Sequence, residues 1–127
     1  MKRARFAAWA ALAAGLIIRL AAAGPPPQSE FTQGKEVFGK RCTGCHALDM
    51  EKEGPRLRGV FGRKAAAIQS FAYSDALRKS QLTWDSESLN KWLEDPSSLA
   101  PGTDMEFRVT DASERGAIIT YLKQISR

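Results

Sequence analysis

The stretch that decides the fold is Cys42-Thr43-Gly44-Cys45-His46, which contains both cysteines of the chain and its single histidine. Two thiols at this spacing, followed at once by an imidazole, are typical of a covalent attachment site for c-type haem. The two thiols can add across the two vinyl groups of the porphyrin to form thioether bonds. His46 is then held over the same edge of the ring and can bind the iron from one face.

Two other kinds of site use cysteine pairs, and the sequence argues against both. A redox-active pair of the thioredoxin type needs strand–helix–strand surroundings, and the chain shows no sustained strand alternation. A structural zinc site needs four ligands, and two cysteines with one histidine are one short. We therefore expect one covalently bound haem c, attached through Cys42 and Cys45, and no disulfide.

Length and charge exclude several classes of protein. The 127 residues are enough for one domain and too few for two ordinary ones. Much of the formal charge of +5 lies in the first 23 residues, which hold four basic side chains and no acidic one. The other 15 Lys and Arg residues, 19 less these four, are balanced by 14 Asp and Glu residues. Because the domain is nearly neutral and has no basic stripe, we expect no nucleic-acid partner.

The N-terminal segment predicts export from the cytoplasm. A positively charged start is followed by the apolar run Phe6–Ile18, and Ala21-Ala22-Ala23 suits cleavage by signal peptidase. We expect residues 1–23 to be a signal peptide. The alternative is an uncleaved anchor, in which residues 6–23 tether the protein to the inner membrane.

The domain boundaries follow from this interpretation. Residues 24–29 contain three consecutive prolines, which favour a polyproline linker and exclude a helix. Residues 30–127 then form the haem domain. This domain is expected in the periplasm, or anchored to the inner membrane and facing the periplasm.

The pattern of apolar residues predicts helices and long loops. Helices are expected from Ser29 or Glu30 into the Cys42–His46 motif, over Ser74–Lys79, over Asp85–Glu94, and from Asp111 to the end of the chain. Pro96 should stop the third helix, and Asp111 with Glu114 forms a capping box for the last. Residues 47–72 and 96–110 are expected to be loops that wrap the ring, so the fold class is all-α.

The second iron ligand is sought among the methionines, because the chain has no second histidine. Met1 lies in the targeting segment, and Met50 follows His46 too closely to reach the other face of the ring. Met105 lies in a loop after the turn Pro101-Gly102 and is the remaining candidate. Coordination by histidine and methionine raises the reduction potential and fills the iron, which favours electron transfer over catalysis.

Residues 30–127 resemble the class I cytochromes c, in the mitochondrial-like branch that includes many small bacterial cytochromes. Besides Cys42–His46, the matching stretches are Gly34–Phe38, Gly54–Lys64, Phe71–Ala76, Leu82–Trp84, Trp92–Pro96, Pro101–Phe107 and Tyr121-Leu122. The resemblance implies the cytochrome c fold, with three to five helices and long loops around one haem. It also implies that His46 and Met105 are the axial ligands.

The resemblance assigns further residues to the haem environment. The carbonyl of Pro55 should accept a hydrogen bond from the His46 ring. The other positions implied by the resemblance are Arg63, Tyr73 and Trp84 around a propionate, Thr103 on the propionate side of the methionine loop, and Trp92 and Phe107 elsewhere around the ring. Gly34, Phe38 and Tyr121 match the crossing of the first and last helices.

The chain also departs from the family pattern. Trp92 stands where the family often has a tyrosine close to the methionine sulfur, so that hydroxyl is missing. Leu77 replaces an asparagine of the mitochondrial haem-side network, and both changes predict a more apolar pocket. The lysine ring of the mitochondrial proteins is largely absent, for example at Asp104 and Asp111.

These observations predict a monomeric, monohaem carrier of one electron in a respiratory or photosynthetic-type chain, with no enzymatic activity. Its partners are expected to be redox proteins such as cytochrome complexes, an oxidase or a reductase. One alternative is a membrane-tethered electron shuttle. Another is a haem enzyme or gas sensor with a labile sixth ligand.

Overall fold

The computed structural model describes residues 27–127, and the predicted signal peptide or anchor lies outside them. The described residues contain five helices: α1 (Pro27–Arg41), α2 (Asp75–Lys79), α3 (Ser86–Glu94), α4 (Pro96–Leu99) and α5 (Ala112–Gln124). Within this part of the chain the only strand-like pairing recorded is an isolated bridge between Lys64 and Thr83. The predicted all-α class is confirmed.

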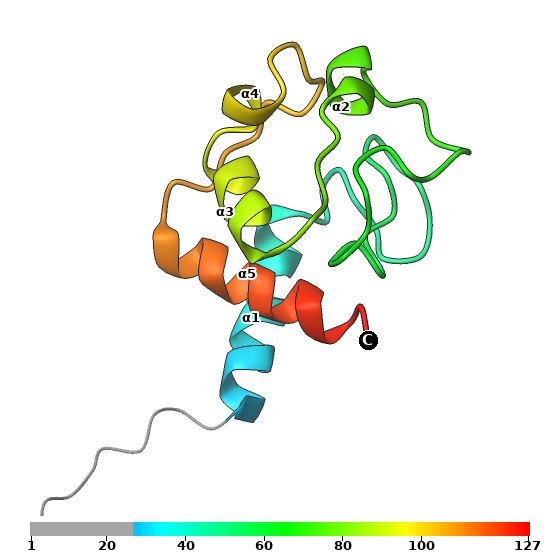
Figure 1. Cartoon of the computed structure of the whole chain (residues 1–127). Coiled ribbons are helices and arrows are strands. Elements are labelled where there is room, and N and C mark those ends of the chain that lie inside the picture. The colour runs from blue at the N-terminus through cyan, green and yellow to red at the C-terminus, as the bar shows by residue number, and fades with distance from the viewer. Residues whose placement is uncertain (1–26) are drawn as a thin grey trace, which may run out of the picture.

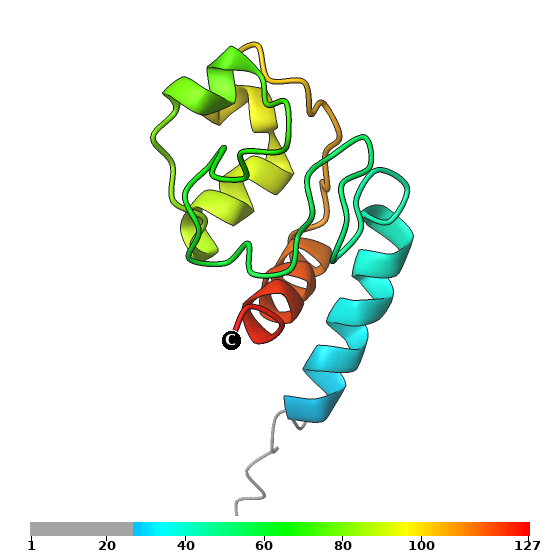
Figure 2. The same cartoon turned by 90° about the vertical axis from the view of Figure 1, so that its right-hand side faces the viewer.

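The helices lie in two groups around the long loops. Figures 1 and 2 show α1 and α5 side by side at one end of the molecule, and α2 and α4 together at the other. The third helix packs against both α4 and α5. The chain between α1 and α2 runs over the remaining side as an extended loop, as residues 47–72 were expected to do (Figure 2).

Gly34 is the point where α1 and α5 approach each other most closely. A Cβ atom placed on Gly34 would lie within 3.0 Å of the Ala117 carbonyl oxygen and 2.8 Å from Tyr121 Cβ. Tyr121 also packs against two rings of α1, with centroids 5.3 Å from Phe31 and 5.2 Å from Phe38. The predicted helix crossing is therefore confirmed, and glycine is required there because the backbones leave no room for a side chain.

Gly34→Ala should destabilise the protein, and Gly39→Ala should not. Overpacking a tight contact costs about 1–3 kcal/mol, which corresponds to a fall in melting temperature of roughly 5–20 °C for a domain of this size. Gly39 lies on the same helix with nothing within 4 Å of its Cβ position, so alanine there should be neutral or slightly stabilising. Thermal unfolding of both variants followed by circular dichroism tests the pair. Equal melting temperatures would contradict the close-contact argument.

The third helix has the start that its sequence predicts. Asp85 is the N-cap, since its carboxylate accepts a hydrogen bond from the Ser88 N–H at 2.8 Å, and the Asp85 N–H donates to Ser88 Oγ at 2.9 Å. Its apolar face carries Leu89, Trp92 and Leu93, which are all buried. The helix ends before Pro96, as expected. This helix brings Trp92 into the interior of the molecule.

Pro96 also begins a short helix that the sequence analysis did not predict. Residues 96–110 were expected to be a loop, but α4 occupies the first four of them. Proline is tolerated at the first helical position because the N–H it lacks would have no partner there, and the Asp95 side chain caps the turn by accepting from Ser97 N–H. The expectation that residues 96–99 belong to a loop was therefore wrong, whereas the end of the preceding helix before Pro96 was predicted correctly.

The first helix differs from prediction for the same reason. It begins at Pro27, so the expected non-helical linker 24–29 is helical over its last three residues.

The start of α5 is closer to prediction, because Asp111 accepts from the Glu114 N–H at 2.8 Å. The reciprocal half of the capping box is missing, since the Glu114 carboxylate bonds to Arg41 instead. Within residues 27–127, no helix combines the length and apolar character of a membrane span.

Candidate functional site

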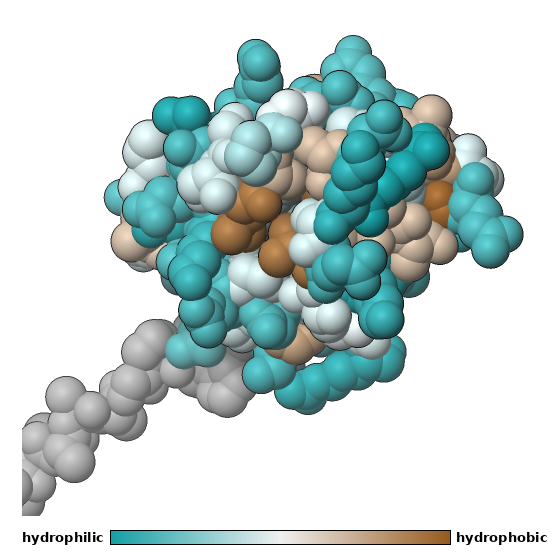
Figure 3. Space-filling model, turned by 45° about the horizontal axis from the view of Figure 1, so that its top comes forward, coloured by the Kyte–Doolittle hydropathy of each residue, from teal (hydrophilic) through white to brown (hydrophobic). Residues whose placement is uncertain are grey.

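All the predicted site residues line one cavity of about 550 Å³ between the helices and the long loops. They come from the stretch between the end of α1 and the loop before α5: Cys42, Cys45, His46, Pro55, Arg63, Tyr73, Trp84, Trp92, Thr103, Met105 and Phe107. The volume lies within the range of about 300–1,000 Å³ that is usual for cofactor and ligand sites. Figure 3 shows apolar residues, in brown, exposed between hydrophilic ones on one face of the molecule.

The Cys42–His46 motif continues the helical path of α1 for one further turn. The Cys42 N–H donates to Phe38 O at 2.9 Å, and the His46 N–H donates to Cys42 O at 2.9 Å. The Lys52 ammonium closes the turn by donating to the carbonyl oxygens of Thr43 and Gly44, at 2.6 and 3.1 Å. The two thiols and the imidazole are therefore presented to the cavity from one compact turn.

The two thiols differ in their surroundings. Burial raises the pKa of Cys42 to about 12, so this thiol is neutral at ordinary pH. Cys45 is exposed at the mouth of the cavity, and a hydrogen bond with the Glu53 side chain raises the pKa of its thiol as well. Both sulfur atoms are free of a disulfide. They are thus available as thiols for addition to a carbon–carbon double bond.

The His46 ring is oriented by the backbone of Pro55. The His46 Nδ1 atom lies 2.8 Å from the Pro55 carbonyl oxygen. Because a carbonyl can only accept, Nδ1 carries the proton and Nε2 keeps its lone pair. Burial lowers the pKa of His46, which favours the neutral imidazole that a metal requires. A hydrogen-bond acceptor of this kind, on the nitrogen that does not bind the metal, fixes the ring of a metal-binding histidine.

Gly54 packs directly against the His46 ring, a contact that the sequence analysis missed. A Cβ atom on Gly54 would lie 2.6 Å from Nδ1 and 2.7 Å from Nε2 of His46. The Gly54 N–H also donates to Cys45 O at 2.8 Å, which fixes its backbone to the motif. The sequence analysis assigned a role at the ring to the Pro55 carbonyl but none to Gly54, because no local signal separates a glycine that packs on a ring from one in an ordinary turn.

Met105 is contacted by the indole of Trp92. Trp92 Nε1 donates a hydrogen bond to Met105 Sδ at 3.2 Å. The tyrosine hydroxyl of the family is absent at this position, and the indole N–H supplies a different donor to the sulfur. Trp84 packs edge-on against Trp92, with ring centroids 5.1 Å apart, and holds the indole in place.

Trp92→Phe should lower the reduction potential of the haem-loaded protein. The N–H donor withdraws electron density from the sulfur, so its removal makes the sulfur a stronger donor and favours ferric iron. A net hydrogen bond of about 1 kcal/mol corresponds to a fall of up to about 40 mV for one electron. Potentiometric titration measures the shift. Trp92→Tyr, whose hydroxyl can donate to the sulfur, should recover part of it, and an unchanged potential in Trp92→Phe would contradict the role of the N–H.

The remaining predicted residues surround other parts of the cavity. Arg63 is half-buried and donates to the carbonyl oxygens of Arg58 and Arg56, at 3.3 and 3.0 Å. It makes no ion pair with a carboxylate among the described residues, so its charge remains available to an anionic group of a ligand. Thr103 is buried beside the cavity, whereas Phe107 is 46% exposed at its rim.

Several apolar residues of the cavity wall lie on helix faces whose apolar spacing served in the sequence analysis only to predict the helices. Leu89 and Leu93 line it from α3, and Ile118 and Leu122 line it from α5. Their spacing of four residues marks the buried face of a helix but does not reveal whether that face meets another helix or a ligand. The walls are thus largely apolar, and the polar groups that line the space include the His46 imidazole, the Met105 thioether and the Arg63 guanidinium. This combination fits a flat, largely apolar macrocycle that carries a metal and acidic substituents.

The sequence and the structure are similar to those of known proteins. The sequence profile of the family described as Cytochrome c matches residues 31–126. The chain is 37% identical to "Cytochrome c2" of Blastochloris viridis, with 88% of this chain and 91% of the relative covered. It is 38% identical to "Cytochrome c type-1" of Ascaris suum, with coverage of 77% and 90%. Among solved structures, "cytochrome cH from Methylobacterium extorquens" matches with a TM-score of 0.69 and 41% identity over 73% of this chain and 96% of that one.

Proposed function

The chain belongs to the cytochrome c family, and on that premise we propose that it carries single electrons in a respiratory or photosynthetic-type electron transfer chain. As a member of the family it binds one covalently attached haem c and acts as a haem electron carrier. The observation that carries the proposal is that a histidine with an oriented ring and a methionine with a hydrogen-bonded sulfur line the same apolar cavity.

Cys42 and Cys45 are proposed to attach the haem. Each S–H would add across one vinyl group, with the sulfur bonded to one carbon and the hydrogen to its neighbour, so that no oxidant would be needed. The placement of both thiols on one turn at the cavity supports this assignment. Variants with alanine at both cysteines should lose covalent haem, which denaturing electrophoresis with haem staining detects.

His46 and Met105 are proposed as the axial ligands. When bound, the haem supplies a one-electron couple between ferrous and ferric iron. The Pro55 carbonyl holds the His46 ring with Nε2 free, and the Trp92 N–H orients Met105 Sδ. Because both axial positions are then filled by the protein, electron transfer is favoured over substrate binding at the iron, and we propose no enzymatic activity.

The rim of the cavity carries both acidic and basic side chains, which does not favour partners of one particular charge. Exposed Phe107 is flanked by Glu106, while Lys40 and Asp104 are exposed elsewhere on the rim. Weak redox encounters need interfaces below about 1,200 Å², so a monomer suffices. The proposed partners are redox proteins such as cytochrome complexes, an oxidase or a reductase.

We propose that the domain lies in the periplasm, because residues 1–23 have the basic start, apolar run and cleavage site of a signal peptide. The tethered shuttle differs from the free carrier only in keeping these residues. Mass spectrometry of the mature N-terminus separates them. A chain that begins near Gly24 contradicts the tether, and one that retains residues 6–23 contradicts the free periplasmic carrier.

The visible spectrum of the holoprotein in both oxidation states tests the function. We expect a haem c spectrum, a weak ferric band at the red end from sulfur–iron bonding, and a reversible one-electron titration. A ferric protein without the red band that binds small ligands tightly would instead indicate a haem enzyme or a gas sensor.

A further inference from the structure

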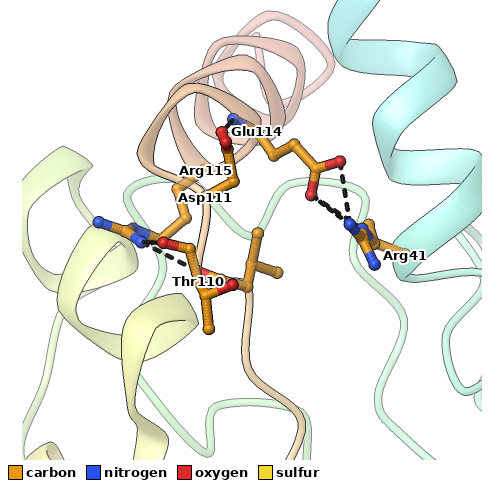
Figure 4. A network of polar contacts seen from close by, with 6 residues as sticks. Arg41, Thr110, Asp111, Glu114 and Arg115 are labelled. Atoms are coloured by element: carbon orange, nitrogen blue, oxygen red, sulfur yellow. Dashed lines mark hydrogen bonds and ion pairs between the residues drawn. The ribbon is translucent and has the colours of Figure 1, made fainter.

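Glu114 and Arg115 are neighbours in the first turn of α5, and their side chains reach in different directions. In Figure 4 the Glu114 side chain extends toward α1 and meets Arg41, whereas Arg115 extends toward α3 and Thr110. The two segments that carry the candidate iron ligands lie next to these contacts, since Arg41 directly precedes Cys42 and Thr110 follows the Met105 segment. The first turn of α5 therefore joins both ligand-bearing segments.

The contact with Arg41 is a two-pronged ion pair at the surface. Arg41 Nε and one terminal nitrogen lie 2.8 and 3.0 Å from the two carboxylate oxygens of Glu114. The side chains are 47% and 30% exposed. An ion pair exposed to water to this extent contributes little to the free energy of folding. We therefore expect its loss to have only a small effect on the first turn of α5.

Arg115 makes stronger contacts, because its side chain is buried. The residue is 6% exposed, and one terminal nitrogen donates to the carbonyl oxygens of Val109 and Thr110, both at 2.9 Å. Its Nε donates to Asn90 Oδ1 at 2.9 Å, and its other terminal nitrogen lies 3.4 Å from Glu94 Oε1. The guanidinium thus joins the end of the methionine segment to α3, the helix that carries Trp92.

The Met105 segment has two buried ends and an exposed middle. Thr103 and Val109 are buried, whereas Asp104 and the stretch 106–108 are exposed. At the far end the Val109 N–H donates to Leu93 O at 2.7 Å and the Val109 carbonyl accepts from Arg115. If Arg115 is lost, a buried carbonyl loses its donor, and leaving such a group unpaired is costly. Release of the segment would then relieve that cost.

We propose that Arg115 is a positioning residue that keeps Met105 at the iron by holding the Val109–Thr110 end of its segment. The inference rests on the proposed ligation by Met105. Arg115→Gln should increase the rate at which the Met105 sulfur leaves the ferric iron by about tenfold or more, since the loss of one buried hydrogen bond to a charged group is worth about one factor of ten. Glu114→Gln, one residue away on the same turn, should change that rate by less than about threefold.

Ligand exchange on the ferric holoprotein tests the proposal. Imidazole is added at increasing concentration, and stopped-flow absorbance at the red sulfur–iron band follows the loss of Met105. At saturating imidazole the observed rate equals the opening rate of the segment. Arg115→Lys keeps the charge but lacks the forked donors, and its opening rate should lie between those of the wild type and Arg115→Gln. It also serves if Arg115→Gln does not fold.

Gly34→Ala controls for general destabilisation, because it weakens the α1–α5 crossing without touching the methionine segment. At equal loss of melting temperature, Arg115→Gln or Arg115→Lys should open faster than Gly34→Ala. Equal opening rates at equal melting temperature would overturn the positioning role. A wild-type ferric protein without the red band would overturn the ligation by Met105 and this inference with it, whereas a normal band with an unchanged opening rate would overturn this inference alone.

Discussion

Met105→Ala should abolish the red ferric band of the holoprotein and lower its reduction potential. A thioether is a soft ligand that favours ferrous iron, and water or hydroxide in its place favours the ferric state. The fall should be on the order of 0.2 V, a part of the roughly 0.8 V range that axial ligands control. Visible spectroscopy and potentiometric titration measure both effects. The Trp92 N–H would at the same time lose its acceptor.

Met50 provides a matched control for this substitution. Its side chain is 63% exposed, and it is not among the residues that line the cavity. Met50→Ala should therefore leave the spectrum and the potential unchanged. Retention of the red band in Met105→Ala would show that another group supplies the sulfur, whereas loss of the band in Met50→Ala would contradict the assignment of Met105.

The features that could be predicted from the sequence depend on short-range rules. The Cys42–His46 spacing indicates the cofactor because two thiols and an imidazole on one short segment can reach two vinyl groups and the iron of the same ring. Caps and apolar spacing predicted α3 and the apolar face of α5 because these signals act within one or two turns. Met105 was predicted by elimination, and its role as a ligand stays a prediction, although it lines the same cavity as His46.

The features that could not be predicted depend on contacts between distant segments. The hydrogen bond from Trp92 to the Met105 sulfur was not predicted, because residue type alone does not show where an indole N–H points. Nothing in the sequence around Arg115 distinguishes it from a surface arginine, yet it lies buried against two other segments. Pro96 shows a related limit, since proline both stops one helix and begins the next. The predictions for residues 1–26 stay predictions, because these residues lie outside the described part.

Gly54→Ala should impair the histidine side of the site more than any other single methyl group added to the chain. The added Cβ would overlap the His46 ring, 2.6 Å from Nδ1 and 2.7 Å from Nε2. The backbone of residue 54 cannot easily withdraw, because its N–H is bonded to Cys45 O and the next carbonyl is bonded to His46 Nδ1. The ring must therefore move, and either its hydrogen bond to Pro55 or its bond to the iron is strained.

We expect the melting temperature of the Gly54→Ala holoprotein to fall by roughly 10–20 °C, which corresponds to an overpacking cost of about 3 kcal/mol. Its ferric spectrum should contain a high-spin component from weakened histidine ligation. Gly116→Ala is the matched control, because nothing lies within 4 Å of a Cβ at that exposed position of α5. A low-spin spectrum and a wild-type melting temperature in Gly54→Ala would mean that His46 has room to shift. In that case the Pro55 carbonyl, and not the packing of Gly54, would be the group that sets the orientation of the ring.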